Sequence, residues 1–141
     1  MKRVLVDTGP LVAILSPADS HHELCVDALR QMQVPLLSCW PVITEAAWLL
    51  RNSPHALRRL LESIDNQFLE LLPLSGAEAA PIAALMKKYE DLRPQLADAA
   101  LVYLAGRERI RLIFTLDNRD FSVYRGSSRR NFFEIVPEPR H

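Results

Sequence analysis

Two acidic residues follow apolar segments that have the composition of buried strands. Asp7 comes directly after residues 4–6, and Asp117 comes shortly after residues 112–114, with Thr115 between them. In open α/β sheets, ligands bind in the crevice beyond the carboxyl ends of the strands. We therefore treat Asp7 and Asp117 as candidates for a binding site. Either aspartate could instead order a turn or cap the helix that follows it.

Glu45 lies in a segment whose spacing is helical and whose neighbours are apolar. Spacings of three and four residues place it on one face with Val42, Trp48 and Leu49. This pattern predicts that Glu45 points towards the interior. The alternative is a half-buried glutamate whose hydrogen bonds are satisfied and which has no functional role.

Asp98 has the same character in a later segment. It shares a predicted helical face with Leu101, Val102 and Ala105, close to the start of that helix. A first-turn carboxylate favoured by the helix dipole is the structural alternative. An isolated carboxylate that leaves water must be paired, protonated or bound to a metal, and no Lys or Arg shares the predicted face of either acid.

The four carboxylates together favour metal chemistry. If the sheet brings Asp7, Glu45, Asp98 and Asp117 to one crevice, their negative charges repel one another unless a cation neutralises them. Oxygen ligands favour Mg²⁺ or Mn²⁺, whereas zinc sites usually include His or Cys. Divalent ions held in this way serve hydrolysis of phosphodiesters or phosphomonoesters.

The segments that would position these acids alternate between strand and helix. Apolar runs predict strands at 4–6, 35–37, 69–72 and 112–114, with a late edge strand at 132–136. Helices are predicted over 19–32, from Pro41, from Pro54 with Ser53 as its cap, from Ser75 or Gly76, and over 97–107 with its end near Gly106. This order predicts a three-layer α/β/α sandwich around a mostly parallel sheet.

Composition limits the remaining possibilities. The chain has 141 residues, which favours one domain over 1–141. Its 17 basic and 17 acidic residues balance, so nucleic-acid binding would need a local basic patch. Only four glycines are present, and no glycine-rich phosphate loop occurs. The two cysteines have no metal or redox spacing, and no signal peptide or membrane-length apolar run is present, so we expect a cytoplasmic protein.

The motifs in this order resemble the PIN-domain ribonucleases, and among them the VapC-type toxins of bacterial toxin–antitoxin pairs. The resemblance rests on Val-Asp-Thr-Gly-Pro at 6–10, Thr-Glu at 44–45, Leu-Ala-Asp-Ala-Ala at 96–100 and Phe-Thr-Leu-Asp-Asn-Arg-Asp-Phe at 114–121. It covers the chain from Val4 to about Val136. One departure from the family pattern is Arg-Pro-Gln at 93–95, just before Asp98.

The resemblance implies a Mg²⁺- or Mn²⁺-dependent endoribonuclease that is often a homodimer and is held inactive by a small antitoxin. It implies that the metal ligands and catalytic acids are Asp7, Glu45, Asp98 and Asp117, with the Thr115 hydroxyl helping to position them. Asp120 falls at a position where the acid varies in the family, so it is a secondary candidate. His21 and His22 lie where many relatives have a histidine, but a solvent-exposed pair on a helix is the simpler interpretation.

Arginine is concentrated in the last third of the chain. Between Gly106 and Arg130 lie seven arginines, at 107, 109, 111, 119, 125, 129 and 130, against three acids. The planar guanidinium binds phosphate in a bidentate manner, so a rim of arginines would hold an RNA backbone near the carboxylates. We take Arg107 and Arg119 as the substrate-binding candidates. The alternative is an ordinary solvated surface.

Two other functions are consistent with parts of this pattern. A catalytically silent PIN-fold module that only binds RNA or a protein would be expected to lack one of the carboxylates, and all four are present. A phosphatase with an aspartyl nucleophile also has an aspartate after its first strand. It requires a second aspartate two residues later, where this chain has Gly9.

Overall fold

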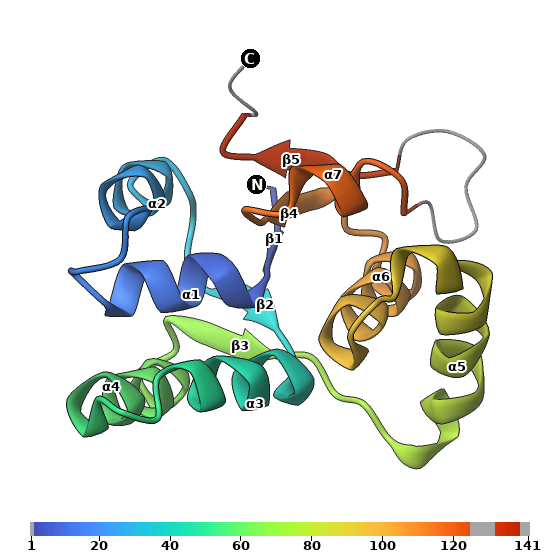
Figure 1. Cartoon of the computed structure of the whole chain (residues 1–141), viewed down its shortest axis with the longest axis horizontal. Helices are drawn as coiled ribbons and strands as arrows, with labels where there is room; N and C mark the ends of the chain where they lie inside the picture. The colour runs from blue at the N-terminus through green and yellow to red at the C-terminus, as the bar shows by residue number, and fades with distance from the viewer. Residues whose placement is uncertain (1, 125–131, 139–141) are drawn as a thin grey trace.

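Five short strands form one parallel sheet at the centre of the molecule (Figure 1). The computed structural model describes residues 2–124 and 132–138. Along the sheet the strand order is β3-β2-β1-β4-β5. The bounds are β1 Val4–Val6, β2 Leu36–Ser38, β3 Leu69–Leu71, β4 Leu112–Phe114 and β5 Glu134–Val136. The predicted late edge strand is confirmed, although it begins two residues after the predicted start.

Helices cover both faces of this sheet and so make the predicted three layers (Figure 1). On one side lie α1 and α2, and on the other α5 packs against α6, while α3 contacts both α1 and α6. The helices are α1 Thr8–Leu15, α2 His22–Leu29, α3 Trp40–Leu49, α4 Pro54–Asp65, α5 Ala79–Lys88, α6 Leu96–Glu108 and α7 Asn118–Phe121. Single 3₁₀ turns, η1 Gly76–Glu78 and η2 Glu90–Leu92, precede α5 and α6.

The core lies along the central strand, β1, and its two neighbours, β2 and β4. Every residue of β1 is buried, and Leu5 pairs with Leu37 of β2 on one side and Ile113 of β4 on the other. Strands buried on both faces have continuous apolar sequences, as β1 does. Helix α6 packs closely because its interior face is built from small residues, including Ala100 and Ala105, both fully buried.

Two helix starts follow the predicted chemistry. The Ala56 amide donates to Ser53 Oγ over 3.3 Å, so Ser53 caps α4 as predicted. Pro41 lies in the first turn of α3, where a missing N–H costs nothing. Proline and a capping hydroxyl therefore identified these helix starts correctly.

One helix ends two residues later than predicted, and two helices, α1 and the four-residue α7, were not predicted. Helix α6 passes through Gly106 and ends at Glu108, and the next residue, Arg109, takes a left-handed conformation with φ of 56°. Gly106 is exposed, and a glycine on a solvent-facing helical surface need not end a helix. The longer of the two omitted helices is α1, which begins directly after Asp7 and contains Gly9 and Pro10, two residues that favour a turn.

Three helices begin at the carboxyl ends of central strands. Helix α1 follows β1, α3 follows β2 and α7 follows β4. Each connection is only one to three residues long, so the helix starts lie at the same edge of the sheet. In the described part of the chain, no helix is both long enough and apolar enough to span a membrane.

Candidate functional site

The carboxyl edge of the sheet opens into a groove of about 570 Å³ that is lined by acids. All four predicted acids lie on it, and Asp120 is a fifth. Four different elements supply them: Asp7 ends β1, Glu45 belongs to α3, Asp98 to α6, and Asp117 and Asp120 to the turn and helix after β4. The fold therefore brings together residues that are more than 100 positions apart in the chain.

Asp7 is held in place by two hydrogen bonds. Its Oδ1 accepts from the Thr8 amide over 2.8 Å, which caps α1, and its Oδ2 accepts from the Thr115 hydroxyl over 2.8 Å. The side chain is buried, with Thr115 fully enclosed beside it. Both interpretations of Asp7 are thus compatible, because one carboxylate caps a helix and faces the groove.

Thr115 connects the first and the last acid of the set. While its hydroxyl donates to Asp7, its oxygen accepts from the Asp117 amide over 2.9 Å. Asp117 in turn caps α7 by accepting from the Asp120 amide over 3.0 Å. The turn after β4 is consequently built on side-chain hydrogen bonds that run from Asp7 to Asp120.

Asp98 has one fixed oxygen and one free to face the groove. Its Oδ2 accepts from the Gln95 amide over 3.0 Å, in a capping box at the start of α6. The residue is half-buried, and the predicted first-turn role at the helix N-terminus is therefore real. The same carboxylate lines the groove opposite Asp7.

The acids of this groove make one another harder to ionise. Burial raises the pKa of Asp7 to about 7, and the Asp98 and Glu45 carboxylates add to this effect. The pKa of Asp98 is raised to about 6, first by burial and then by Glu45, Asp117 and Asp120. Burial and the Asp117 carboxylate also raise the pKa of Asp120, while Arg119 lowers it. The groove thus concentrates negative charge that a cation would relieve.

Glu45 lines the groove, but it does not lie on the helical face on which it was predicted. The prediction that it points into the interior with Trp48 and Leu49 is wrong, because these side chains are 63% and 52% exposed. The buried face of α3 is formed by Val42, Ile43 and Ala46. Glu45 is half-buried at the border of that face, and it makes no ion pair with any described residue.

The carboxylate oxygens of the groove suit a cation that prefers oxygen ligands and keeps part of its hydration shell. They do not form a closed coordination site. Among residues 2–124 and 132–138, no three His, Cys, Asp or Glu side chains converge closely enough to enclose a metal ion. Magnesium commonly binds through one or two carboxylates and keeps several of its waters. Two buried oxygens next to the acids, Thr8 Oγ1 and Asn118 Oδ1, lack any hydrogen-bond partner in the described structure.

The two predicted substrate-binding arginines lie in different places. Arg119 belongs to α7, between Asp117 and Asp120, and is exposed. Arg107 lies in the last turn of α6, nine residues after Asp98, which is roughly 13 Å along the helix. It donates to Pro73 O over 2.8 Å and pairs with Glu78 and Glu108. The structure therefore does not bring Arg107 to the acids, because its guanidinium joins α6 to η1.

Arg93 also lines the groove, and the sequence did not predict it as a site residue. Arg93 lines it from the turn between η2 and α6, in a left-handed conformation with φ of 50°. It belongs to the Arg-Pro-Gln departure from the family pattern, and its closeness to Asp98 in sequence was the available signal. Arg125, Arg129 and Arg130 lie outside the described residues.

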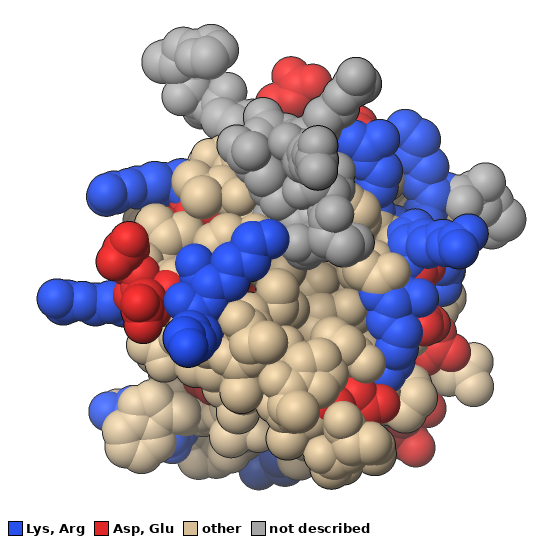
Figure 2. All heavy atoms as spheres, turned by 90° about the vertical axis from the view of Figure 1, so that its right-hand side faces the viewer, with Lys and Arg blue, Asp and Glu red and all other residues tan. Residues whose placement is uncertain are grey.

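Basic residues also occur away from the groove. On the face formed by α5 and α6, Lys and Arg side chains gather on both sides of an uncharged surface (Figure 2). A further basic group, Lys2, Arg3, Arg109 and Arg111, surrounds a depression at the amino ends of β1 and β4. Among the described arginines of the segment, Arg119 lies beside the groove, whereas Arg109 and Arg111 lie at the amino ends of β1 and β4.

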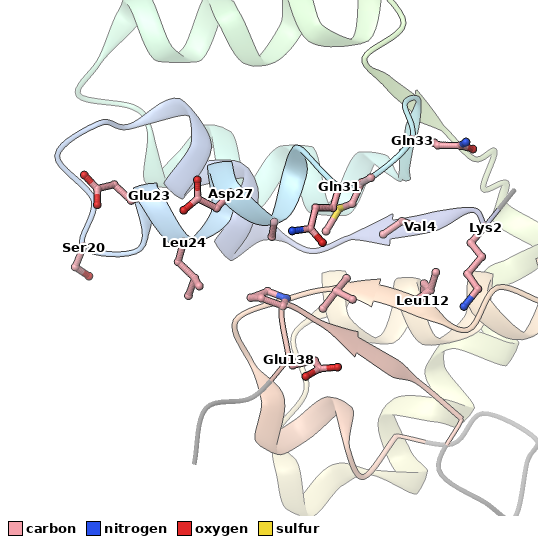
Figure 3. Close-up of a pocket in the computed structure, with 14 residues that line it drawn as sticks. Lys2, Val4, Ser20, Glu23, Leu24, Asp27, Gln31, Gln33, Leu112 and Glu138 are labelled. Atoms are coloured by element: carbon pink, nitrogen blue, oxygen red, sulfur yellow. The ribbon is translucent and has the colours of Figure 1, made fainter.

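A second cavity, of about 880 Å³, is larger than the groove but is lined by different chemical groups. It lies between α2 and the sheet, with Val4 and Leu112 from the amino ends of β1 and β4 on its floor and Glu23, Asp27 and Glu138 on its rim (Figure 3). The two α2 acids are exposed, and Asp27 pairs with Arg30 over 3.1 Å. Size alone would favour this cavity, but the buried and mutually repelling acids belong to the smaller groove.

The described histidines, His21, His22 and His55, and both cysteines lie outside the groove. His22 Nδ1 lies 2.7 Å from Ala13 O, which joins α2 to α1, and His21 is exposed beside Asp19. Cys25 and Cys39 are buried free thiols. His21 is thus exposed as predicted, whereas His22 is half-buried against α1, so the two residues do not form a solvent-exposed pair.

Comparison with known proteins finds a matching family model, a related sequence and a related fold. The family model described as PIN domain matches residues 4–126. Ribonuclease VapC26 of Mycobacterium tuberculosis (strain ATCC 25618 / H37Rv) is 32% identical over 138 residues, which cover 95% of this chain and all of that protein. The crystal structure of Mycobacterium tuberculosis VapC20, described as a sarcin–ricin loop cleaving toxin, superposes with a TM-score of 0.77 at 13% identity, over 87% of this chain and 97% of the other.

Proposed function

Since this chain belongs to the PIN domain family, we propose that it is a metal-dependent endoribonuclease, the toxin of a type II toxin–antitoxin pair. In this proposal, residues 1–141 form one PIN-like domain. The single observation that carries the proposal is the groove that Asp7, Glu45, Asp98 and Asp117 line from four parts of the fold. The relative named as a ribonuclease, at 32% identity, supports the same reaction class.

The cofactor in this proposal is Mg²⁺ or Mn²⁺, held by Asp7, Glu45, Asp98 and Asp117. These residues offer only oxygen donors, which suit the two ions better than zinc. When bound, a divalent ion supplies Lewis acidity at the phosphodiester and lowers the pKa of water at the site. The negative charges that raise the pKa values of Asp7 and Asp98 are the charges such an ion would neutralise.

The side chains of this groove then have separate tasks. Thr115 orients Asp7 through its 2.8 Å hydrogen bond and fixes the turn that carries Asp117. Asp98 keeps one oxygen on the Gln95 amide and presents the other. Arg93 and Arg119, at the groove and beside it, bind the RNA backbone and bring one phosphate to the carboxylates.

The partners in this proposal are RNA, a small antitoxin and a second copy of the chain. Support comes from exposed apolar side chains on α3 and at the start of α6: Trp40, Trp48, Leu49 and Leu96 are 52–63% exposed. Leu49 also lines the acidic groove, so a protein bound there would block access of RNA. We place the protein in the cytoplasm, whose reducing conditions suit its two free thiols.

A cleavage assay tests this function. Purified protein is incubated with structured and unstructured RNA in Mn²⁺, in Mg²⁺ and after addition of a chelator, alongside Asp98→Asn. We expect cleavage that needs the ion and falls at least about a hundredfold in the variant, as when an essential charge-stabilising group is removed. The matched control is Asp27→Asn, which removes an exposed aspartate of α2.

The assay separates the alternatives. Cleavage that persists in both chelator and Asp98→Asn would rule out the metal mechanism. RNA binding without cleavage would favour the catalytically silent module.

A further inference from the structure

Tyr124 is a buried tyrosine whose hydroxyl has nothing to bind. The residue is 1% exposed, and its hydroxyl has no hydrogen-bond partner among the described residues. Its ring packs edge-on against Tyr89 and Phe121, with ring centroids 5.1 Å apart in each case. Phenylalanine would fill this space equally well, as Phe121 and Phe133 do beside it. The packing therefore does not explain why the residue has a hydroxyl group.

The location of Tyr124 suggests what the hydroxyl is for. The Tyr124 amide donates to Asp120 O over 3.0 Å, which ties the residue to the turn that carries Asp117 and Asp120. Burial raises the pKa of the Tyr124 hydroxyl, and the carboxylates of Asp98, Asp120, Asp117 and Asp7 raise it further, in that order. The hydroxyl thus remains a neutral donor within electrostatic reach of the acids of the groove, with Asp98 the strongest influence.

A buried hydroxyl without a partner is unfavourable, so a protein keeps one where another state of the molecule satisfies it. Tyr124 does not line the groove, and its hydroxyl donates to none of the acids in the described structure. A hydrogen bond to one of them therefore needs a bridging water or a rotation of the acid's side chain. Its own ring contacts would hold it there without a change in the backbone.

Resting on the proposed function, we propose that Tyr124 is a positioning residue, whose buried hydroxyl donates a hydrogen bond, directly or through one water, to Asp98 in the cation-bound groove. The bond holds the Asp98 carboxylate in the orientation that the cation requires. Tyr124 touches neither RNA nor the reacting atoms. It acts through Asp98 alone, and its contribution appears when the cation binds.

The test uses Tyr124→Phe, which removes only the oxygen. Mn²⁺ affinity is measured by isothermal titration calorimetry, thermal stability of the metal-free protein by calorimetry, and RNA cleavage at several RNA concentrations. We expect Mn²⁺ to bind about tenfold more weakly, and kcat to fall by a similar factor while KM for RNA stays within about twofold, as for loss of one charge-assisted hydrogen bond. The Tm of the metal-free protein should be unchanged or higher, because the lost hydroxyl had no partner.

The matched control is Tyr103→Phe, which removes the hydroxyl of a half-buried tyrosine on α6, the helix that also carries Asp98. It should leave Mn²⁺ affinity and cleavage unchanged. Equal Mn²⁺ affinity in wild type and Tyr124→Phe, with active wild type, would overturn this inference alone. A Tm that falls by more than a few degrees would also overturn it, since the hydroxyl would then be bonded without metal. Wild type that neither binds Mn²⁺ nor cleaves RNA would overturn the proposed function and this inference with it.

Discussion

The Thr115 hydroxyl donates to Asp7 Oδ2 over 2.8 Å, joining two residues that lie 108 positions apart in the chain. The same oxygen accepts from the Asp117 amide. One buried side chain therefore sets the positions of two acids that follow neighbouring strands, β1 and β4. This arrangement makes Thr115 a determinant of both stability and site geometry.

We predict that Thr115→Val destabilises the protein by about 1–3 kcal/mol, the cost of leaving buried hydrogen-bonding groups without a partner. The free energy of unfolding is measured by urea denaturation. Thr115→Ser retains the hydroxyl and should recover most of the loss and most of the RNA cleavage. Equal free energies of unfolding for wild type and Thr115→Val would show that the hydrogen bond makes no net contribution to stability.

The raised pKa of Asp7 predicts how stability changes with pH in the metal-free protein. Folding raises this pKa from 3.8 to about 7, so between these values the native state holds more protons than the unfolded state. The contribution of Asp7 to stability therefore falls as pH rises from about 4 to about 7. Asp98, with a pKa of about 6, acts in the same direction up to that pH.

Urea denaturation at several pH values, in the presence of a chelator, measures this slope. Asp7→Asn cannot ionise and should flatten it, whereas Asp65→Asn, at the exposed end of α4, should not. Addition of Mn²⁺ should reverse the trend, because the ion binds the ionised carboxylates. A metal-free protein that becomes more stable from pH 4 to pH 7 would contradict the account.

Arg93 and Arg107 should respond differently to removal. Arg93 lines the groove and is exposed, so we predict that Arg93→Ala raises KM for RNA by about three- to tenfold with little change in Tm, as for loss of one phosphate contact. Arg107 is part of an ion-pair group with Glu78 and Glu108. Arg107→Ala should lower Tm and leave KM unchanged.

Steady-state cleavage and calorimetry of the same preparations measure both effects. The control for charge is Arg30→Ala, since Arg30 is exposed on α2 and pairs only with Asp27 among the described residues. If Arg107→Ala raises KM and Arg93→Ala does not, then RNA follows the α6 surface and not the groove.

These residues also show which parts of the site the sequence can predict. Asp7 and Asp117 were identifiable because the end of a buried strand in a parallel sheet lies where ligands bind. Asp98 was identifiable because a carboxylate on an otherwise apolar helical face loses hydration and must be paired, protonated or bound to a metal. All three arguments depend on local sequence only, and the structure places all three acids on the groove.

Glu45, Arg107 and Tyr124 show where local reasoning ends. The buried face of α3 depends on how that helix contacts α1 and α6, which spacing within α3 does not contain. The partners of Arg107 come from η1 and from its own helix end, so only the tertiary structure shows that it is already engaged. Tyr124 carries no sequence signal for its role, because its missing hydrogen bond is visible only in three dimensions.

The central claim is that one divalent cation binds at a site formed by Asp7, Glu45, Asp98 and Asp117. Calorimetric titration of the purified protein with Mn²⁺ at pH 7.5 tests this claim directly, with Asp98→Asn and Asp27→Asn measured in parallel. We predict that wild type and Asp27→Asn bind with equal affinity and that Asp98→Asn binds at least about tenfold more weakly, as for loss of one charged ligand. Equal affinity of Asp98→Asn and wild type, or no saturable binding by wild type, would contradict it.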